Sequence, residues 1–168
     1  RLEANPLADL TQSMTDISFA GHLEAEIKDV RPLKVVTSSY LEPKGYLNAD
    51  LNISGTIKKP RVEGTVVLED GEIFIPQLNI RPRDIKLLVD GREDSIVMDL
   101  QLMSGEGKAR AEGVFTFADK RWNASFEISG SNVELMNQTD IILVANPDLL
   151  VDLGPEGGKL SGPSVIPQ

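Results

Sequence analysis

The strictest pattern in this chain is a two-residue alternation of apolar and polar side chains, clearest between Leu47 and Ile57. Leu47, Ala49, Leu51, Ile53 and Ile57 fall on one side of the alternation, and Asn48, Asp50, Asn52, Ser54, Thr56 and Lys58 fall on the other. A period of two over this length is typical of a β-strand with one dry face and one wet face. The pattern therefore favours a fold made of extended strands, each with one face toward water.

The alternation resumes after Lys58-Lys59-Pro60, but the small and apolar residues now fall at even-numbered positions: Val62, Gly64, Val66 and Leu68. Proline cannot donate a hydrogen bond to a sheet ladder, so Pro60 predicts a break between two strands. Asp70-Gly71 is typical of a hairpin turn, because both residues tolerate a positive φ. We therefore predict a third, shorter strand from Ile73 to Ile75, which ends at Pro76.

Similar segments continue along the chain and are separated by short turn signals. They are Ile17–Ile27, Ile85–Val89, Ile96–Leu102, Ala109–Phe117, Trp122–Ile128 and Leu149–Leu153, with a continuous apolar run at Ile141–Ala145. Short connections favour antiparallel neighbours joined in sequence order. Two short helices are expected, at Pro6–Met14 and from Pro32 onward, too few for βαβ crossovers. The prediction is an all-β fold, a single antiparallel meander of about ten strands with one or two short N-terminal helices.

Composition limits the classes of protein to which the chain can belong. Its 168 residues suffice for one domain, with a short helix and first strand over 1–40 and repeated strands over 45–168. The formal charge of −9 disfavours nucleic acid and anionic membrane surfaces, which bind positive protein surfaces. The absence of cysteine excludes disulfides and thiolate metal sites. No apolar run is long enough for a transmembrane segment, and a start at Arg1 without a signal peptide suggests a fragment of a longer protein.

The alternating segments together create one long apolar face. About 18 large apolar side chains fall on it between Leu47 and Ile128. Left open at ~50 Å² each, they would expose on the order of 900 Å², more than the 300–600 Å² of the largest apolar patch on a typical monomer. The sheet can fold over as a sandwich, close as a barrel, be plugged by the short helices, or curl into an open trough around an apolar guest. Alternation alone favours a packed protein core over the trough.

Short motifs recur in a fixed order along the chain. They are Gly45-x-Leu47-x-Ala49-x-Leu51-x-Ile53-x-Gly55-Thr56-Ile57-x-x-Pro60, Val66-x-Leu68-x-Asp70-Gly71-x-Ile73-x-Ile75-Pro76, Ser104-Gly105-x-Gly107-x-Ala109-x-Ala111-x-Gly113, Asn146-Pro147-Asp148-Leu149 and Gly158-x-Leu160-x-Gly162. In this order and spacing they resemble the C-terminal region of the TamB family of AsmA-like proteins, over most of residues 17–167. Each motif alone is a common turn pattern, so the resemblance depends on their order.

The resemblance implies a fold, a location and partners. TamB-like proteins are anchored in the inner membrane and span the periplasm of diderm bacteria, and the family is associated with a β-taco, a curled sheet whose apolar interior forms a long groove. It implies transport of phospholipid or another acyl-chain guest between the two membranes, assembly of autotransporter-type outer-membrane proteins with a TamA-like barrel of the Omp85 type, or both. The alternative is a module without lipid that offers a strand edge to such a barrel or to its substrate.

With this resemblance, the apolar face becomes a candidate lipid groove instead of a packed core. Its expected lining is Leu47, Leu51, Ile53, Val66, Leu68, Ile85, Leu87, Val89, Ile96, Met98, Leu100, Leu102, Phe115, Phe117, Trp122, Phe126 and Ile128. The chain is expected to be a non-enzymatic segment with no catalytic residue, metal site or cofactor.

Other candidate sites are better explained as ordinary surface features. His22, the one histidine, falls on the polar side of its strand. Glu69, Asp70 and Glu72 cluster at a predicted turn, but a calcium site needs a shaped loop of converging oxygens. Gly105-x-Gly107 precedes a strand and not a helix, which excludes a phosphate cradle. Lys58, Lys59 and Arg61 form a small basic spot suited to the edge of a sheet.

Overall fold

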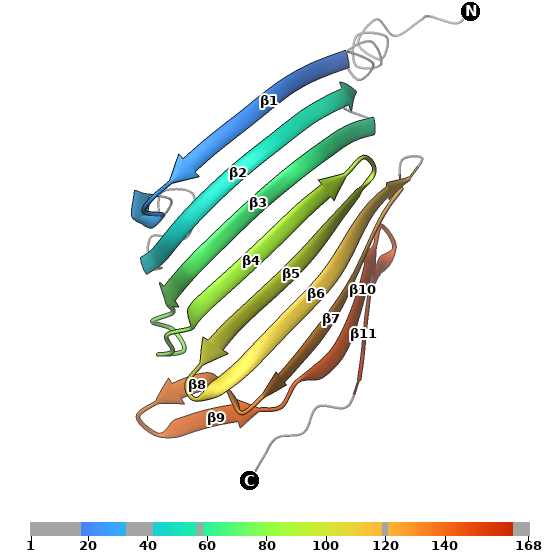
Figure 1. Ribbon diagram of the computed structural model, residues 1–168. Coiled ribbons are helices and arrows are strands. Elements are labelled where there is room, and N and C mark those ends of the chain that lie inside the picture. Colours follow the sequence, from blue (N-terminus) through green and yellow to red (C-terminus); the bar gives the residue numbers. More distant parts are fainter. Residues whose placement is uncertain (1–17, 33–41, 57–58, 119–120, 163–168) are drawn as a thin grey trace, which may run out of the picture.

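The protein is built almost entirely from β-strands (Figure 1). The computed structural model describes residues 18–32, 42–56, 59–118 and 121–162. Its strands are β1 (Ser18–Ile27), β2 (Glu42–Thr56), β3 (Lys59–Phe74), β4 (Arg83–Arg92), β5 (Ser95–Ser104), β6 (Gly107–Ala118), β7 (Arg121–Ser131), β8 (Val133–Gln138), β9 (Ile141–Ala145), β10 (Asp148–Gly154) and β11 (Gly157–Ser161). The predicted all-β class is confirmed. The helix expected at Pro6–Met14, and residues 33–41 of the second, lie outside the described residues.

Nine strands form one antiparallel sheet in the order β1-β2-β3-β4-β5-β6-β7-β10-β11. From β1 to β7 each strand pairs with its successor in the sequence, which confirms the predicted meander. The structure adds one feature that the sequence did not indicate. Strands β8 and β9 form a separate two-stranded sheet, and β10 returns to pair with β7.

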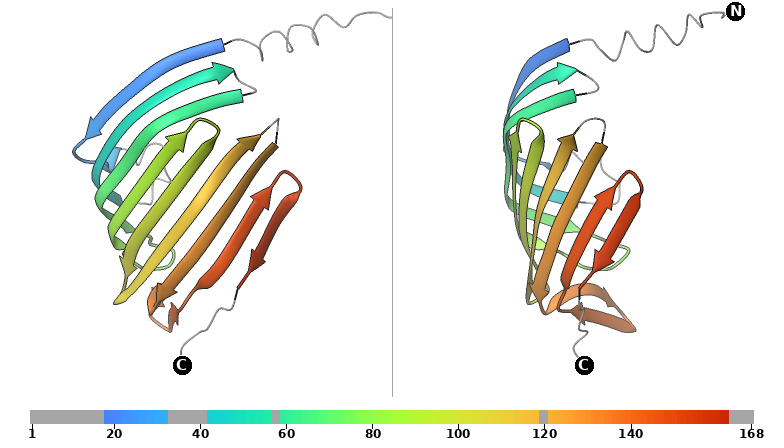
Figure 2. Two further views of the ribbon diagram at one scale, coloured as in Figure 1. Left: turned by 45° about the vertical axis from the view of Figure 1, so that its right-hand side comes forward. Right: turned by 90° about the vertical axis from the view of Figure 1, so that its right-hand side faces the viewer.

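The large sheet is an open, curved layer. Its strands arch to one side, so that it resembles a trough (Figure 2). It does not close into a barrel, since within the described residues β1 pairs only with β2 and β11 only with β10. Neighbouring strands lie ~4.8 Å apart, so the sheet extends roughly 38 Å from β1 to β11.

Strand β3 continues through Asp70-Gly71, where the sequence predicts a hairpin turn. The pairing of β3 with β4 shifts between Leu68 and Gly71, and Asp70 has a φ of 50°. One extra residue in β3 thus forms a β-bulge, which uses the same tolerance of positive φ as a turn. Leu68 lies opposite Leu47 and Ile73 lies opposite Pro43, so both remain on one face. The predicted turn and the separate strand at Ile73–Ile75 are therefore wrong.

Pro60 lies inside β3 and not between two strands. It is the second residue of the strand and pairs with Gly55 near the end of the β2–β3 ladder. Proline is tolerated at the beginning of a strand, where one missing N–H donor costs little pairing. The break between β2 and β3 therefore comes earlier than the sequence suggests.

The β8–β9 hairpin crosses one end of the large sheet (Figure 1). The hydroxyl of Ser104, at the end of β5, donates to the backbone oxygen of Glu134 in β8 at 2.6 Å. The backbone N–H of Asn137 donates to the oxygen of Leu78, in the β3–β4 connection, at 2.9 Å. Val133 and Ala145 pair with each other in the hairpin and are both buried, as is Ile80 of the β3–β4 connection. In the described part of the chain, most of the fully buried apolar residues therefore belong to this end.

Candidate functional site

The residues predicted to line a groove share one face of the large sheet, which we call the apolar face. Residues directly opposite each other in an antiparallel ladder carry their side chains on the same face. One row across the sheet is Leu47, Leu68, Leu87, Leu100, Ala111 and Ile128, and a second is Ala49, Val66, Val89, Met98, Gly113 and Phe126. A third row is Leu51, Gly64, Gly91, Ile96, Phe115 and Ala124. The other predicted residues, Ile53, Ile85, Leu102, Phe117 and Trp122, occupy the same side of their strands.

Within the described residues, the apolar face has no second layer of protein over most of its area. None of the predicted groove residues is fully buried: all are half-buried except Trp122, which is 38% exposed. Among the described residues the fully buried apolar side chains are Val30, Ile80, Ala124, Val133 and Ala145, and none of them belongs to the predicted groove set. Within the described chain, this face is therefore covered neither by a second sheet, as in a sandwich, nor by closure into a barrel.

The apolar face extends to both edges of the sheet, beyond the predicted set. On β1, Phe19 and Leu23 are 37% and 49% exposed, and Leu23 lies opposite Leu51. At the other edge, Leu153 and Leu160 are 37% and 66% exposed. Phe19, Leu23 and Leu153 belong to segments whose alternation is visible in the sequence, whereas Leu160 lies in β11, outside those segments. The sequence did not indicate that β10 follows β7 across the β8–β9 hairpin, and so did not place Leu153 beside Ala124.

Aromatic side chains gather at one end of the apolar face, away from the β8–β9 hairpin. Phe115 and Trp122 stack with ring centroids 5.6 Å apart and planes 5° apart. Phe117 contacts Phe115 at 4.5 Å in a tilted arrangement. Stacked rings restrain one another, so the indole of Trp122 is held in a defined orientation at the rim of the face.

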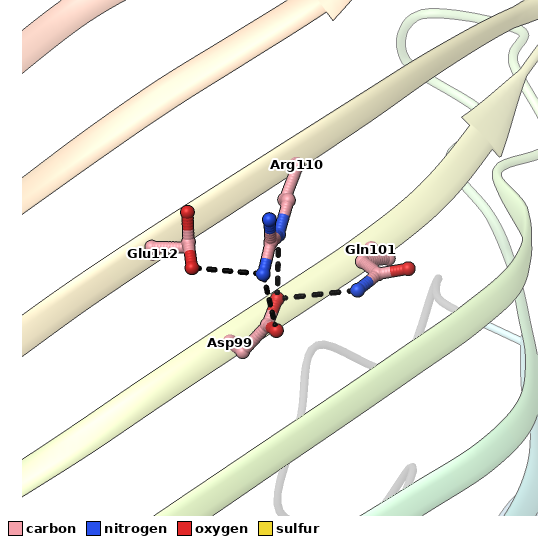
Figure 3. Close-up of polar contacts among 4 residues, drawn as sticks. All are labelled: Asp99, Gln101, Arg110 and Glu112. Atoms are coloured by element: carbon pink, nitrogen blue, oxygen red, sulfur yellow. Dashed lines mark hydrogen bonds and ion pairs between the residues drawn. The ribbon is translucent and has the colours of Figure 1, made fainter.

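The opposite, polar face carries charged pairs that join neighbouring strands. Arg110 of β6 donates to both carboxylate oxygens of Asp99 in β5, at 3.2 and 2.8 Å, and contacts Glu112 at 2.8 Å (Figure 3). The Arg110 hydrogen bonds lower the pKa of Asp99; burial opposes that shift, and the Gln101 amide adds a smaller lowering. These groups remain partly exposed, so each pair adds little stability. They do favour the observed pairing of β5 with β6.

No family model matches this chain, and no curated protein or solved structure matches it either. The TamB-like assignment therefore stays a prediction from motif order. What the structure supplies independently is the geometry of the apolar face.

The other candidate sites of the sequence are placed on the polar face or at turns. His22 Nδ1 lies 3.1 Å from Asn52 Oδ1 and 3.7 Å from Asp50, and its side chain is half exposed. Gly105 has a φ of 61° in the tight turn between β5 and β6. Arg61 is exposed on β3, and Lys58 lies outside the described residues. In the described ranges, no three histidine or acidic side chains are grouped to hold a metal ion, and no helix is long and apolar enough to span a membrane.

Of the acidic residues near the β3 bulge, Glu72 forms ion pairs with two basic side chains. Its carboxylate accepts from Lys44 at 2.8 Å and from Arg81 at 2.9 Å. The hydrogen bonds from Lys44, and then from Arg81, lower the pKa of Glu72. Arg81 also lies over the ring of Phe74, 4.7 Å from its centroid. This cluster fixes the end of β3 and leaves Glu72 engaged by protein cations.

Proposed function

We propose that this chain is a segment of a periplasmic bridge whose apolar face carries or shields acyl chains. The observation that carries the proposal is a nine-stranded sheet whose apolar face is half-exposed and lacks a protein layer over most of the described chain. Burying apolar surface is worth about 25 cal/mol per Å². An uncovered face of this extent therefore favours an apolar partner.

Acyl chains suit this face better than a ligand that needs directed hydrogen bonds. The predicted lining is aliphatic and aromatic, and it offers area in place of polar groups. From Ile96 to Leu102, β5 presents apolar side chains over about 20 Å, at ~3.4 Å per residue, which is close to the length of an extended long acyl chain. A chain laid along the strands would fit this width, and the sheet has room for several side by side.

The resemblance to the TamB family supplies the biological setting of the proposal. The chain would belong to an inner-membrane-anchored protein that spans the periplasm of a diderm bacterium. Its guests would be phospholipids on their way between the inner and outer membranes. In the same setting it would support assembly of autotransporter-type proteins together with a TamA-like outer-membrane barrel.

A photo-crosslinking residue on either side of one strand tests this proposal. Leu100 lies on the apolar face and the adjacent Gln101 lies on the polar face, opposite Lys86 and Arg110. In the intact protein inside cells, a crosslinker at Leu100 is expected to trap phospholipid, whereas one at Gln101 is expected to trap none. Equal lipid labelling at both positions, or none at Leu100, would contradict the proposal.

A second candidate function is supported by the free edge of β1. This strand pairs over ten residues with β2 in an unbroken register, and nothing among the described residues pairs with its other side. A long, regular edge can accept an extended segment of another protein. A crosslinker at the exposed Glu24 would then capture a polypeptide. Capture of a polypeptide at Glu24 with no lipid at Leu100 would favour this second function over the first.

A further inference from the structure

The β8–β9 hairpin lies on the apolar side of the large sheet, at one end of its strands. Ser104, whose hydroxyl donates to the backbone of β8 at 2.6 Å, comes two residues after Leu102 in β5 and therefore shares its face. On β7, Gly130 likewise shares the face of Ile128, and a Cβ added at Gly130 would meet Val133 Cγ2 at 2.7 Å. The hairpin thus covers the apolar face where β5 and β7 end.

The hairpin reaches from the end of β7 to the β3–β4 connection. The backbone N–H of Asn137 donates to Leu78 O at 2.9 Å, and the side-chain amide of Gln138 donates to Gln77 O at 2.8 Å. Figure 1 shows the hairpin crossing this end of the sheet. Because both of its ends are attached, it forms a fixed wall across the strands between β3 and β7.

This wall has an apolar side. Val133 pairs with Ala145 and Met136 pairs with Leu143, which comes two residues before Ala145, so these four side chains share one side of the hairpin. Val133 and Ala145 are buried, and Met136 and Leu143 are half-buried. In the described chain, no buried side-chain nitrogen or oxygen lacks a hydrogen-bond partner. The wall therefore suits the methyl end of a chain better than a charged group, whose burial without a partner is costly.

The opposite end of the apolar face is open. Among the described residues, no strand crosses the sheet there (Figure 1). Trp122, the one tryptophan of the chain, is 38% exposed at this end and stacks on Phe115. Tryptophan is favoured where an apolar region meets a wet one, because its large ring has one polar N–H. From Leu102, near the hairpin, to Ile96, opposite Phe115, β5 covers about 20 Å at ~3.4 Å per residue.

We propose that the β8–β9 hairpin is an end wall that fixes the direction of a bound acyl chain; this inference rests on the proposed function. The methyl end of the chain lies against the hairpin, near Leu102. The polar end leaves the sheet at Trp122, where water solvates it. The proposed function requires only that acyl chains cover the apolar face, in either direction. The wall adds a single direction, so that all headgroups leave from the same side of the sheet.

Tryptophan fluorescence tests this direction, because a nitroxide quenches an indole only at short range. The probes are two isomers of stearic acid, one with a nitroxide near the carboxyl group and one with a nitroxide near the methyl end. In the unmodified, delipidated protein, we expect the carboxyl-end isomer to quench Trp122 more strongly. In the double variant Trp122→Phe with Leu102→Trp, we expect the methyl-end isomer to quench more strongly.

A matched control carries Gln101→Trp together with Trp122→Phe. Gln101 precedes Leu102 in β5 and lies on the polar face, so neither bound isomer should quench a tryptophan there. Calorimetric titration with unlabelled stearic acid measures binding independently of quenching. If the Leu102→Trp variant does not fold, the two isomers compared on the unmodified protein still decide the direction.

The outcomes separate this inference from the proposed function. If stearic acid binds but both isomers quench Trp122 equally, or the methyl-end isomer quenches it more, the fixed direction is disproved while the acyl-chain groove stands. If stearic acid does not bind, the proposed function fails and the end wall fails with it. Quenching at Gln101→Trp as strong as at Leu102→Trp would contradict both, because it would place the acyl chain off the apolar face.

Discussion

Leu100 and Gln101 are neighbours in β5 but belong to opposite faces of the sheet. Placing a carboxylate at Leu100 removes apolar contact with Leu87 and Ala111 and puts a charge among half-buried side chains. We expect Leu100→Glu to lower the free energy of unfolding by about 1–3 kcal/mol, the cost of a polar group without a partner. Gln101→Glu is the matched control, because this exposed position lies between Lys86 and Arg110. Urea unfolding of both variants gives the comparison, and equal midpoints would refute the assignment of faces.

The charged pair on the polar face makes a prediction about pH. Hydrogen bonds from Arg110 hold the pKa of Asp99 below its usual value. A carboxylate with a lowered folded-state pKa stabilises the fold above its unfolded pKa of about 3.9, and this contribution disappears as pH falls through the folded value. The stability difference between the unmodified protein and Asp99→Asn should therefore be present at pH 7 and shrink below about pH 4. Urea unfolding at several pH values measures it. A difference that grows on acidification would contradict the sign of the shift.

At the scale of single strands, the bulge in β3 depends on Gly71. A Cβ at this position would meet Ile85 Cβ at 2.7 Å and Ile85 O at 3.0 Å, too close for the adjacent strand to accept. We expect Gly71→Ala to destabilise the protein by about 1–3 kcal/mol through this overpacking. Gly21→Ala is the control, since a Cβ there meets nothing within 4 Å, and it should be neutral or slightly stabilising. Thermal unfolding of the two variants measures the difference. Similar losses of stability in both would argue against a strained β3–β4 contact.

The same bulge marks the limit of what the alternation could predict. The two-residue alternation identified most strands because each strand has one apolar side. For the same reason it predicted which residues share the apolar face. The parity change after Leu68 is compatible with a turn or with a bulge, and Asp70-Gly71 suits both conformations. Only the pairing of Ile73 with Pro43 distinguishes them, and that is a contact between distant parts of the chain.

The β8–β9 hairpin shows a second limit. Ile141–Ala145 is an apolar run that suits a buried strand in any sheet, so its sequence does not state which partner it takes. The structure places it in a separate hairpin, tied to the β3–β4 connection through Asn137 and Leu78. A hydrogen bond of this kind joins backbone groups far apart in the chain, and it leaves no periodic pattern in the sequence. The covering of the apolar face is likewise a three-dimensional property, and the sequence left sandwich, barrel and trough open.

At the scale of the whole molecule, the contacts between elements are mostly local. Each strand of the large sheet packs mainly against its two neighbours, and β8 adds contacts to β5 and β6. Chains built in this manner resemble repeat proteins, in which stability is a sum of nearest-neighbour terms. A second layer that links distant strands would make unfolding more cooperative. Within the described residues the protein supplies such a layer only at the β8–β9 corner.

A bound guest on the apolar face would provide the missing layer, and this gives the last prediction. A ligand that binds only the folded state stabilises it by RT ln(1 + [L]/Kd), about 2.7 kcal/mol when its concentration is one hundred times Kd. We expect delipidated protein to melt at a lower temperature and over a broader range than protein purified with its guest. Adding back a long-chain phospholipid should restore both the midpoint and the sharpness of the transition. Leu100→Glu should reduce this gain, whereas Gln101→Glu should keep it. Scanning calorimetry with and without lipid makes the measurement, and identical transitions in the two states would mean that the apolar face does not take up acyl chains.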